Sequence, residues 1–246
     1  MVVADITEVL MTPRSACDLR QQEDPLALLT ATVPVKYEKG AIVYAELKQA
    51  GHLHLIVRGR VKVCRRAGDR PIVMDVYGPD EFFGESALLD MEFLPEEAVA
   101  LEKTEVMRWT KCEIEQLVLD RPLLGVALIQ TLARRAIDLG ARLQHCLGEK
   151  TAGRVLRSLI CFSERTGVAG RAGSVHLTPF THQLLAEYTG TSREIVTQHM
   201  NKFRRQGLLN YSHQEIVLNP RAFQETERGT HREAHPDTVA LDGTAA

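Results

Sequence analysis

The period of the hydrophobic positions changes along the chain. Between residues 33 and 110, short runs in which apolar and polar residues alternate are separated by turns that contain glycine. The alternating runs cover 33–37, 53–57, 61–63 and 72–76, and glycines follow at 40, 59 and 78. Because successive side chains of a strand point to opposite faces, a period of two predicts half-buried strands. Many short strands with such turns predict a barrel or jelly roll.

A long helix is predicted after residue 120. Asp120 and Pro122 are helix start signals. A line of apolar residues then recurs at alternating spacings of three and four: Ile129, Leu132, Ala136, Leu139, Leu143 and Cys146. A narrow line of this kind, flanked by charged residues, is typical of a helix that pairs with a second helix, and packing on its own domain is the alternative. We favour the dimer contact.

Composition indicates a globular protein with an uneven charge. The chain has 246 residues, of which 44% are hydrophobic and 25% charged, which excludes a disordered, collagen-like or disulfide-scaffold chain. Residues 1–149 carry 18 basic and 23 acidic side chains, whereas 150–221 carry 10 and 4. The basic block is either a solvated surface or the footprint of a polyanion. With no export signal, no apolar run near 18 residues and five scattered cysteines, we expect a cytoplasmic protein without membrane contact.

The stretch 181–209 has the spacing of a helix-turn-helix. Two short helical patterns are separated by 188–191. Ala186 lets the helices approach each other, Gly190 supplies the positive φ of the turn, and Val196 anchors the second helix on the first. The strand-like runs at 210–211 and 216–218 then predict a hairpin, or wing. Together with the basic excess, this pattern favours DNA binding over two helices with only a structural role.

The second helix is predicted to read bases. We expect Thr191 and Glu194 to form a capping box that starts it. Its first turn then carries Arg193, which donates two hydrogen bonds to guanine, and Glu194, which accepts one from cytosine. The full set of candidate DNA contacts is Thr181, His182, Ser192, Arg193, Glu194, Thr197, Gln198, Lys202, Arg205, Ser212 and His213.

The chain resembles the superfamily of the cyclic-AMP receptor protein and the fumarate-nitrate regulator (Crp/Fnr), which are bacterial transcription factors. The likeness covers about 30 to 220. It depends on LHLIVRGRVKV at 53–63, YGPDEFFGESALLD at 77–90, TLARR at 131–135 and the winged helix. The resemblance implies an α+β fold: an N-terminal β-roll of the cyclic-nucleotide-binding jelly-roll type, a long dimerisation helix and a C-terminal winged helix-turn-helix on palindromic DNA.

The resemblance also implies an effector pocket, with altered chemistry. In nucleotide-binding members the stretch matching Gly84, Glu85, Ser86 and Ala87 lines the pocket, with the Glu on the ribose. Glu96 aligns with the arginine that pairs with the cyclic phosphate, Glu97 with the neighbouring Ser/Thr, and Leu139 and Gly140 with the hydroxyl residues that meet adenine. A carboxylate beside a phosphate is repulsive. We therefore expect that cyclic AMP is not the effector, and leave open a larger nucleotide, another metabolite or no ligand.

No resident cofactor or metal is expected. Cys17 lies far from the next cysteine, so it does not suit a four-thiolate cluster of the kind that oxygen sensors of this superfamily use. His52 and His54 are two apart on a predicted strand, and we favour an exposed strand face over a metal site.

Three classes of function remain at this point. The first is a homodimeric DNA-binding regulator, the second a small-molecule sensor that signals to a protein partner, and the third an enzyme. The absence of a catalytic motif argues against the third. RNA polymerase and an unidentified effector stay open as further partners. The predicted parts are a flexible segment at 1–20, the β-roll sensor at 21–115, the dimerisation helix at 116–148, the winged helix-turn-helix at 149–221 and a disordered tail at 222–246.

Overall fold

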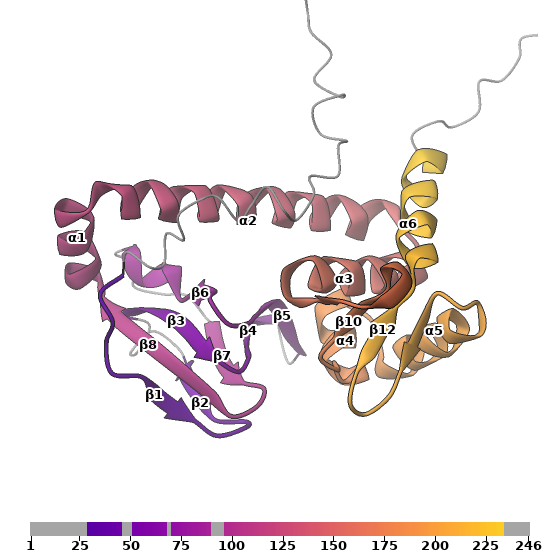
Figure 1. Cartoon of the computed structure of the whole chain (residues 1–246), viewed down its shortest axis with the longest axis horizontal. Coiled ribbons are helices and arrows are strands. Elements are labelled where there is room, and N and C mark those ends of the chain that lie inside the picture. The colour runs from indigo at the N-terminus through magenta and orange to yellow at the C-terminus, as the bar shows by residue number, and fades with distance from the viewer. Residues whose placement is uncertain (1–28, 46–50, 68–69, 90–95, 234–246) are drawn as a thin grey trace, which may run out of the picture.

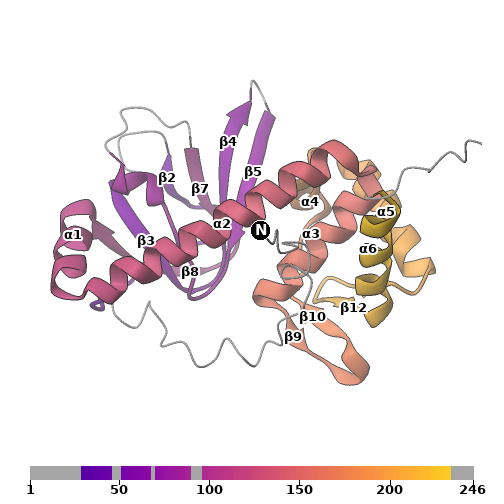
Figure 2. The ribbon, with the colours of Figure 1, turned by 90° about the horizontal axis from the view of Figure 1, so that it is seen from above.

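The computed structural model describes residues 29–45, 51–67, 70–89 and 96–233, which form a β-roll, a long helix and a smaller C-terminal domain (Figure 1). The long helix runs along both the roll and the C-terminal domain (Figure 2). In the described part of the chain no single helix is long and apolar enough to cross a membrane; by length and composition only the pair α1 and α2, bent by 120°, meets that criterion.

The β-roll consists of two four-stranded antiparallel sheets, with strand orders β1-β8-β3-β6 and β2-β7-β4-β5. The strands are β1 Val35–Tyr37, β2 Ile42–Ala45, β3 His52–Arg58, β4 Val61–Ala67, β5 Arg70–Tyr77, β6 Phe82–Phe83, β7 Glu96–Ala100 and β8 Thr104–Thr110. Side chains from both sheets, including Tyr44, Ile56 and Phe83, form the core between them. The alternating pattern thus predicted the strands of the roll correctly.

Two helices cover the outer face of the β1-β8-β3-β6 sheet. They are α1, Lys111–Asp120, and α2, Pro122–Gly148. Leu53, Phe82 and Trp109 of the sheet pack with Ile114 of α1 and Leu124 of α2. Pro122 occupies the first turn of α2, as its start signal predicted.

Helix α1 was not expected, and the predicted boundary at 116 falls inside it. Its start carries a capping box, in which the Thr110 hydroxyl accepts from the Glu113 amide and the Glu113 carboxylate accepts from the Thr110 amide. The T-x-x-E pattern at 110–113 is therefore the sequence signal that identifies this helix.

The C-terminal domain contains four helices and a small sheet with strand order β11-β12-β10-β9. Its elements are α3 Thr151–Thr166, β9 Val168–Ala169, β10 Val175–Leu177, α4 His182–Thr189, α5 Arg193–Arg205, β11 Leu209–Tyr211, β12 Ile216–Leu218 and α6 Pro220–Glu233; the short 3-10 helices η3 Glu85–Leu88 and η4 Arg171–Gly173 complete the fold. Strands β11 and β12 form the predicted wing hairpin.

The expected disordered tail is wrong for its first part. Helix α6 covers Pro220–Glu233, with Ala222 fully buried and Phe223 packed against the core of the C-terminal domain. Through these two apolar side chains, the first turn of α6 packs against α3, although the rest of α6 is polar. The rest of the tail, 234–246, and the predicted flexible segment at 1–20 lie outside the described residues.

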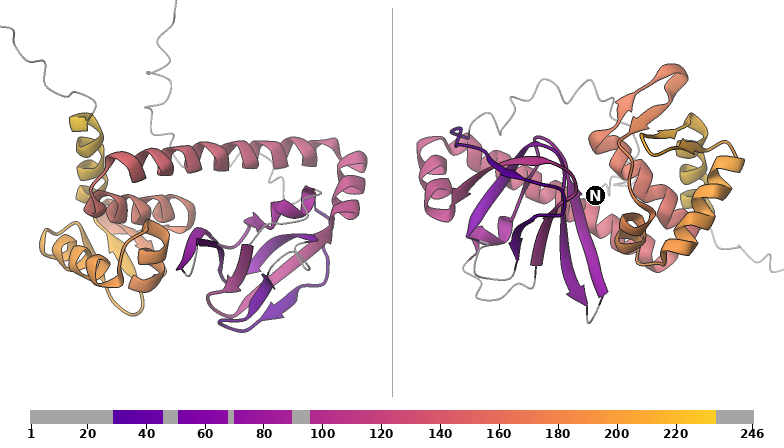
Figure 3. Two further views of the ribbon diagram at one scale, coloured as in Figure 1. Left: turned by 180° about the vertical axis from the view of Figure 1, so that it is seen from behind. Right: turned by 90° about the horizontal axis from the view of Figure 1, so that it is seen from below.

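The roll and the C-terminal domain share one hydrophobic core. Cys64 of β4 and Val73 and Val76 of β5 belong to the same buried cluster as the core of α3, α4 and α5. The β4–β5 hairpin is accordingly the part of the roll that lies against the C-terminal helices (Figure 3). The two domains therefore pack as one unit in this structure.

Candidate nucleic-acid interface and sensor cavity

Helices α4 and α5 meet at the turn that the sequence predicted. Gly190 ends α4 with a φ of +67°, the left-handed conformation that glycine adopts without strain. The Thr191 amide then donates to the Ala186 carbonyl at 3.0 Å. Ala186 and Val196 are both buried where the helices cross. The three residues that defined the helix-turn-helix pattern thus have the expected places.

The capping residue of α5 differs from the expected one. Helix α5 begins at Arg193, and the Ser192 hydroxyl, not that of Thr191, accepts from the Ile195 amide at 3.3 Å. Because the helix starts one residue later than the capping box required, Ser192 is the residue placed beside the free amides of the first turn. Backbone and Ser192 hydrogen bonds lower the pKa of Glu194, which keeps its carboxylate an acceptor.

The two faces of α5 are chemically distinct. Val196, Met200 and Phe203 are buried in the core of the domain. The candidate reading residues on the opposite side are exposed: Arg193, Glu194, Gln198, Lys202 and Arg205. In Figure 1, α5 lies at the end of the molecule opposite α1. A capped helix with one buried face and one polar, mostly basic face suits insertion into a DNA groove.

Thr197 is held by hydrogen bonds within the protein. Its hydroxyl donates to the Arg193 carbonyl at 2.8 Å, and its oxygen lies 2.8 Å from Nδ1 of His182. Since the one hydroxyl hydrogen is directed to Arg193, Nδ1 of His182 is the donor of the second bond. Burial and the nearby Arg193 lower the pKa of His182, which favours the neutral ring. Thr181 caps α4 by accepting from the Leu184 amide at 3.1 Å.

The wing is braced against α5. Tyr211 of β11 donates to the Asn201 side-chain oxygen at 3.0 Å, and the Arg204 guanidinium lies 5.2 Å from the centre of the Tyr211 ring. At the tip, the Ser212 hydroxyl accepts from the Gln214 amide at 3.1 Å, and Ser212 and His213 are exposed. The sequence pattern did not identify this brace, because it depends on contacts between α5 and the sheet.

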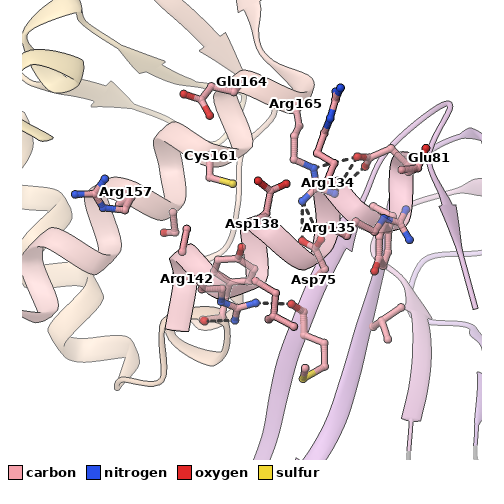
Figure 4. Close-up of a pocket in the computed structure, with 18 of the residues that line it drawn as sticks. Asp75, Glu81, Arg134, Arg135, Asp138, Arg142, Arg157, Cys161, Glu164 and Arg165 are labelled. Atoms are coloured by element: carbon pink, nitrogen blue, oxygen red, sulfur yellow. Dashed lines mark hydrogen bonds and ion pairs between the residues drawn. The ribbon is translucent and has the colours of Figure 1, made fainter. Parts of the chain in front are cut away.

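A cavity of about 760 Å³ lies between the roll, α2 and the C-terminal domain (Figure 4). Four of the expected pocket residues line it: Gly84, Glu85, Glu96 and Leu139. The other four, Ser86, Ala87, Glu97 and Gly140, are not among the described residues that line it. The cavity extends beyond the expected pocket to charged residues of α2 and α3, including Asp138, Arg142 and Arg165.

The two acidic residues of the expected pocket that line the cavity, Glu85 and Glu96, are already paired. Glu96 accepts from the Tyr44 hydroxyl at 2.6 Å and lies 3.4 Å from Arg65. Glu85 lies 3.3 Å from Arg135 of α2. The Arg135 guanidinium also donates to the Phe82 carbonyl and lies 4.2 Å from the centre of the Phe82 ring. An arginine of the protein itself thus reaches the carboxylate that the resemblance assigned to a ribose.

Two further arginines connect the sensor domain to the C-terminal domain. Arg165 of α3 donates to Asp75 at 2.8 Å and to Glu81 at 3.0 Å (Figure 4). Burial would lower the pKa of Arg165, but these two carboxylates outweigh it and raise the pKa. Arg142 of α2 donates to the carbonyls of Met74 and Val73 in β5 and of Tyr188 in α4, the last at 2.6 Å. We call Arg142 and Arg165 the interdomain arginines.

The expected apolar line of α2 is exposed except at one residue. Ile129, Ala136, Leu139, Leu143 and Cys146 are exposed, of which Leu139 and Cys146 also line the cavity, whereas the partly buried Leu132 packs on the core beneath α1 and α2. A second line that shares Ile129, Ala136 and Leu143 with it is exposed at every position, and we call it the exposed stripe: Val126, Ile129, Ala133, Ala136, Gly140, Leu143 and Leu147. It keeps the alternating spacing of three and four. Ile129 is 67% exposed and Leu147 83%.

The expectation of an exposed face for the His52–His54 pair is wrong for His54. This side chain is 3% exposed, and its ring stacks on Phe83 at 4.9 Å. Burial lowers its pKa to about 3, so it is neutral at physiological pH. Within the described residues no group of three or more His, Cys, Asp or Glu side chains has the arrangement of a metal site.

Two family models match the two domains. Residues 34–121 match the cyclic nucleotide-binding domain, and 153–226 match the Crp-like helix-turn-helix domain. The architecture and these matches define the class of protein: a transcription regulator in which a sensor-type β-roll is joined to a helix-turn-helix DNA-binding domain.

Comparison with individual proteins identifies the family. The chain is 26% identical over 195 residues to the CRP-like cAMP-activated global transcriptional regulator of Mycobacterium tuberculosis, covering 78% of this chain and 87% of that protein. It is 27% identical over 190 residues to the cyclic AMP receptor protein of Thermus thermophilus, covering 77% and 85%. The structure of FixK2 from Bradyrhizobium japonicum has the same fold, with a TM-score of 0.69, 23% identity, and coverage of 89% and 100%. The chain belongs to the Crp/Fnr superfamily.

We predict that Arg142→Ala loosens the contact between the two domains. The substitution removes three part-buried hydrogen bonds to carbonyl oxygens, which lowers the free energy of unfolding by about 1–3 kcal/mol. Urea unfolding measures this change. Arg134→Ala is the matched control, because Arg134 is exposed and has no hydrogen bond or ion pair within the described chain. Equal unfolding midpoints for the two variants would contradict the assignment.

Proposed function

We propose that this regulator acts as a homodimer that binds a palindromic DNA site in the cytoplasm, and that cyclic AMP does not control it. The observation that carries the proposal is the exposed first turn of α5, where Arg193 and Glu194 stand on a helix whose other face is buried. The domain that holds α5 is also the basic part of the chain. Both features suit a helix that reads base edges between two phosphate backbones.

We predict that Arg193→Ala weakens specific binding and relaxes one position of the site. Loss of a bidentate contact to guanine costs about 1–3 kcal/mol and leaves that base pair unselected. Selection from random duplexes, followed by fluorescence anisotropy, measures both effects. Lys202→Ala is the control: loss of a phosphate contact weakens all sequences equally and makes the salt dependence less steep. An unchanged preference for guanine in Arg193→Ala would refute the role of Arg193.

The exposed stripe of α2 supports the dimer. Its apolar residues recur with the period of a coiled-coil seam and have no cover within the described chain. Ala133, Ala136 and Gly140 lie in its middle, where small side chains allow two helices to approach closely. In a dimer with twofold symmetry, the exposed stripe of one subunit packs against the same stripe of the other. The two copies of α5 then must lie about 34–36 Å apart to enter successive major grooves.

We predict that Leu143→Glu weakens this dimer. A charge in the apolar seam removes the burial of one leucine in each subunit, so the dimer dissociation constant rises by at least about tenfold. Sedimentation equilibrium measures the constant. Leu119→Glu places the same charge on an exposed leucine of α1, outside the stripe, and should leave the dimer intact. The dimer proposal fails if wild-type protein is monomeric at micromolar concentration or if both variants behave alike.

The paired carboxylates support independence from cyclic AMP. The Mycobacterium tuberculosis relative is named as cAMP-activated, but the resemblance aligns Glu96 of this chain with the arginine that pairs with the cyclic phosphate in nucleotide-binding members. Arg65 is the nearby cation, and Glu96 already neutralises it. Glu85 is occupied by Arg135 in the same way. A cyclic phosphate would have to displace these pairs and then lie beside a carboxylate.

We predict that isothermal titration calorimetry detects no binding of cyclic AMP to the wild-type dimer up to millimolar ligand. The DNA affinity of extensively dialysed protein should likewise not change when cyclic AMP is added. The Glu85→Gln variant is titrated in parallel, because it lacks the carboxylate that the resemblance assigns to a ribose and so shows whether any binding occurs at this pocket. Micromolar binding by the wild type that Glu85→Gln abolishes would show that the pocket accepts cyclic AMP after all.

A further inference from the structure

The first turn of α5 presents an apolar side chain to solvent. Ile195 is 39% exposed, whereas the other large apolar residues of this helix, Val196, Met200 and Phe203, are buried. Ile195 does not belong to any of the buried clusters of the described chain. A single exposed isoleucine is common on protein surfaces, so exposure alone assigns no role to it. A second observation, the position of Ile195 among the candidate base-reading residues, gives its exposure a meaning.

Ile195 lies among the candidate reading residues of α5, which we call the proposed reading surface: Arg193, Glu194, Gln198, Lys202 and Arg205. It follows Arg193 and Glu194 directly, and the helical period puts it beside Gln198 and Lys202, three and seven residues further along α5. Its amide donates to the Ser192 hydroxyl, which fixes the backbone of this turn. A β-branched side chain on a helix has one strongly preferred rotamer. The methyl groups of Ile195 are thus held at a defined place among polar neighbours.

The major groove offers one methyl group to such a side chain, the C5-methyl group of thymine. The base edges otherwise present hydrogen-bond donors and acceptors, with only aromatic C–H groups between them. An isoleucine pressed against donors and acceptors would leave them without partners, which is costly. When the isoleucine side chain packs against a methyl group, both bury apolar surface and exclude water, which is favourable.

We propose that Ile195 determines specificity by contacting the methyl group of a thymine in the same half-site as the guanine read by Arg193. This inference rests on the proposed DNA binding. It is favoured by the fixed state of Thr197, whose hydroxyl is engaged by His182 and by the Arg193 carbonyl and so is less free to read a base. Base selection then falls to Arg193, Glu194, Ile195 and Gln198.

The test uses a duplex selected for binding to the wild type and replaces its thymines with uracil, one symmetric pair of positions at a time. This change removes the methyl group and leaves the base pairing unchanged. Fluorescence anisotropy gives the dissociation constants of wild type and Ile195→Ala for each duplex. We expect one symmetric pair of positions at which uracil weakens wild-type binding by roughly fourfold per half-site, the effect of one buried methyl group. Ile195→Ala should bind the thymine and uracil duplexes equally.

Two controls separate the inference from the proposed function. Ile195→Val keeps a β-branched apolar side chain and should keep the sensitivity to uracil, whereas Lys202→Ala should weaken both duplexes equally. If wild type binds its site specifically but no uracil position weakens it, or if Ile195→Ala retains the full sensitivity, the role of Ile195 is refuted while DNA binding stands. If wild type selects no sequence at all, both proposals fail.

Discussion

The packing of the β4–β5 hairpin on α3 and α4 is the constraint on which the rest of the structure depends. Cys64, Val73 and Val76 enter the core of the C-terminal domain, and the interdomain arginines surround that contact. Arg165 lies between two carboxylates, and Arg142 joins three elements through carbonyl oxygens. Removing one partner from a partly buried pair leaves the other uncompensated. The orientation of α5 relative to α2 is thereby fixed by packing and charge together.

Because of this packing, the elements that line the cavity also make the contacts that hold the helix-turn-helix domain. The cavity is lined by β5, by α2 and by α3, and these elements carry the interdomain arginines and their partners. A ligand in the cavity can change the orientation of α5 only if its affinity differs between two arrangements of the domains. In the structure Arg135 already joins α2 to Glu85 at the edge of η3. A contact made by the chain itself thus ties the long helix to the roll.

The sequence predicted the parts whose signals are local. The helix-turn-helix followed from Ala186, Gly190 and Val196, because a turn of fixed length places them at one crossing. The expected line of α2 is exposed at five of its six residues, and the exception is Leu132, which packs on the core beneath α1 and α2. The heptad pattern alone does not separate this line from the exposed stripe, because both contain Ile129, Ala136 and Leu143. Helix α6 was missed because its composition is polar, and its position depends on the burial of Ala222. The interdomain arginines were missed because their partners lie 46 to 90 residues away.

The proposed reading surface combines the scaffold of the family with side chains particular to this chain. The family resemblance extends to Arg193 and Glu194 in the first turn of α5; one turn on, where the resemblance implies a second arginine, this chain has the uncharged Gln198. Without that cation Glu194 is oriented from within α5, by its own amide and the Ser192 hydroxyl. One less positive charge also lowers the attraction to phosphates that all sequences share. A larger fraction of the binding energy then depends on contacts that differ between bases. We therefore expect discrimination in this chain to depend more on fit, to a guanine edge and to an apolar group beside it, than on charge.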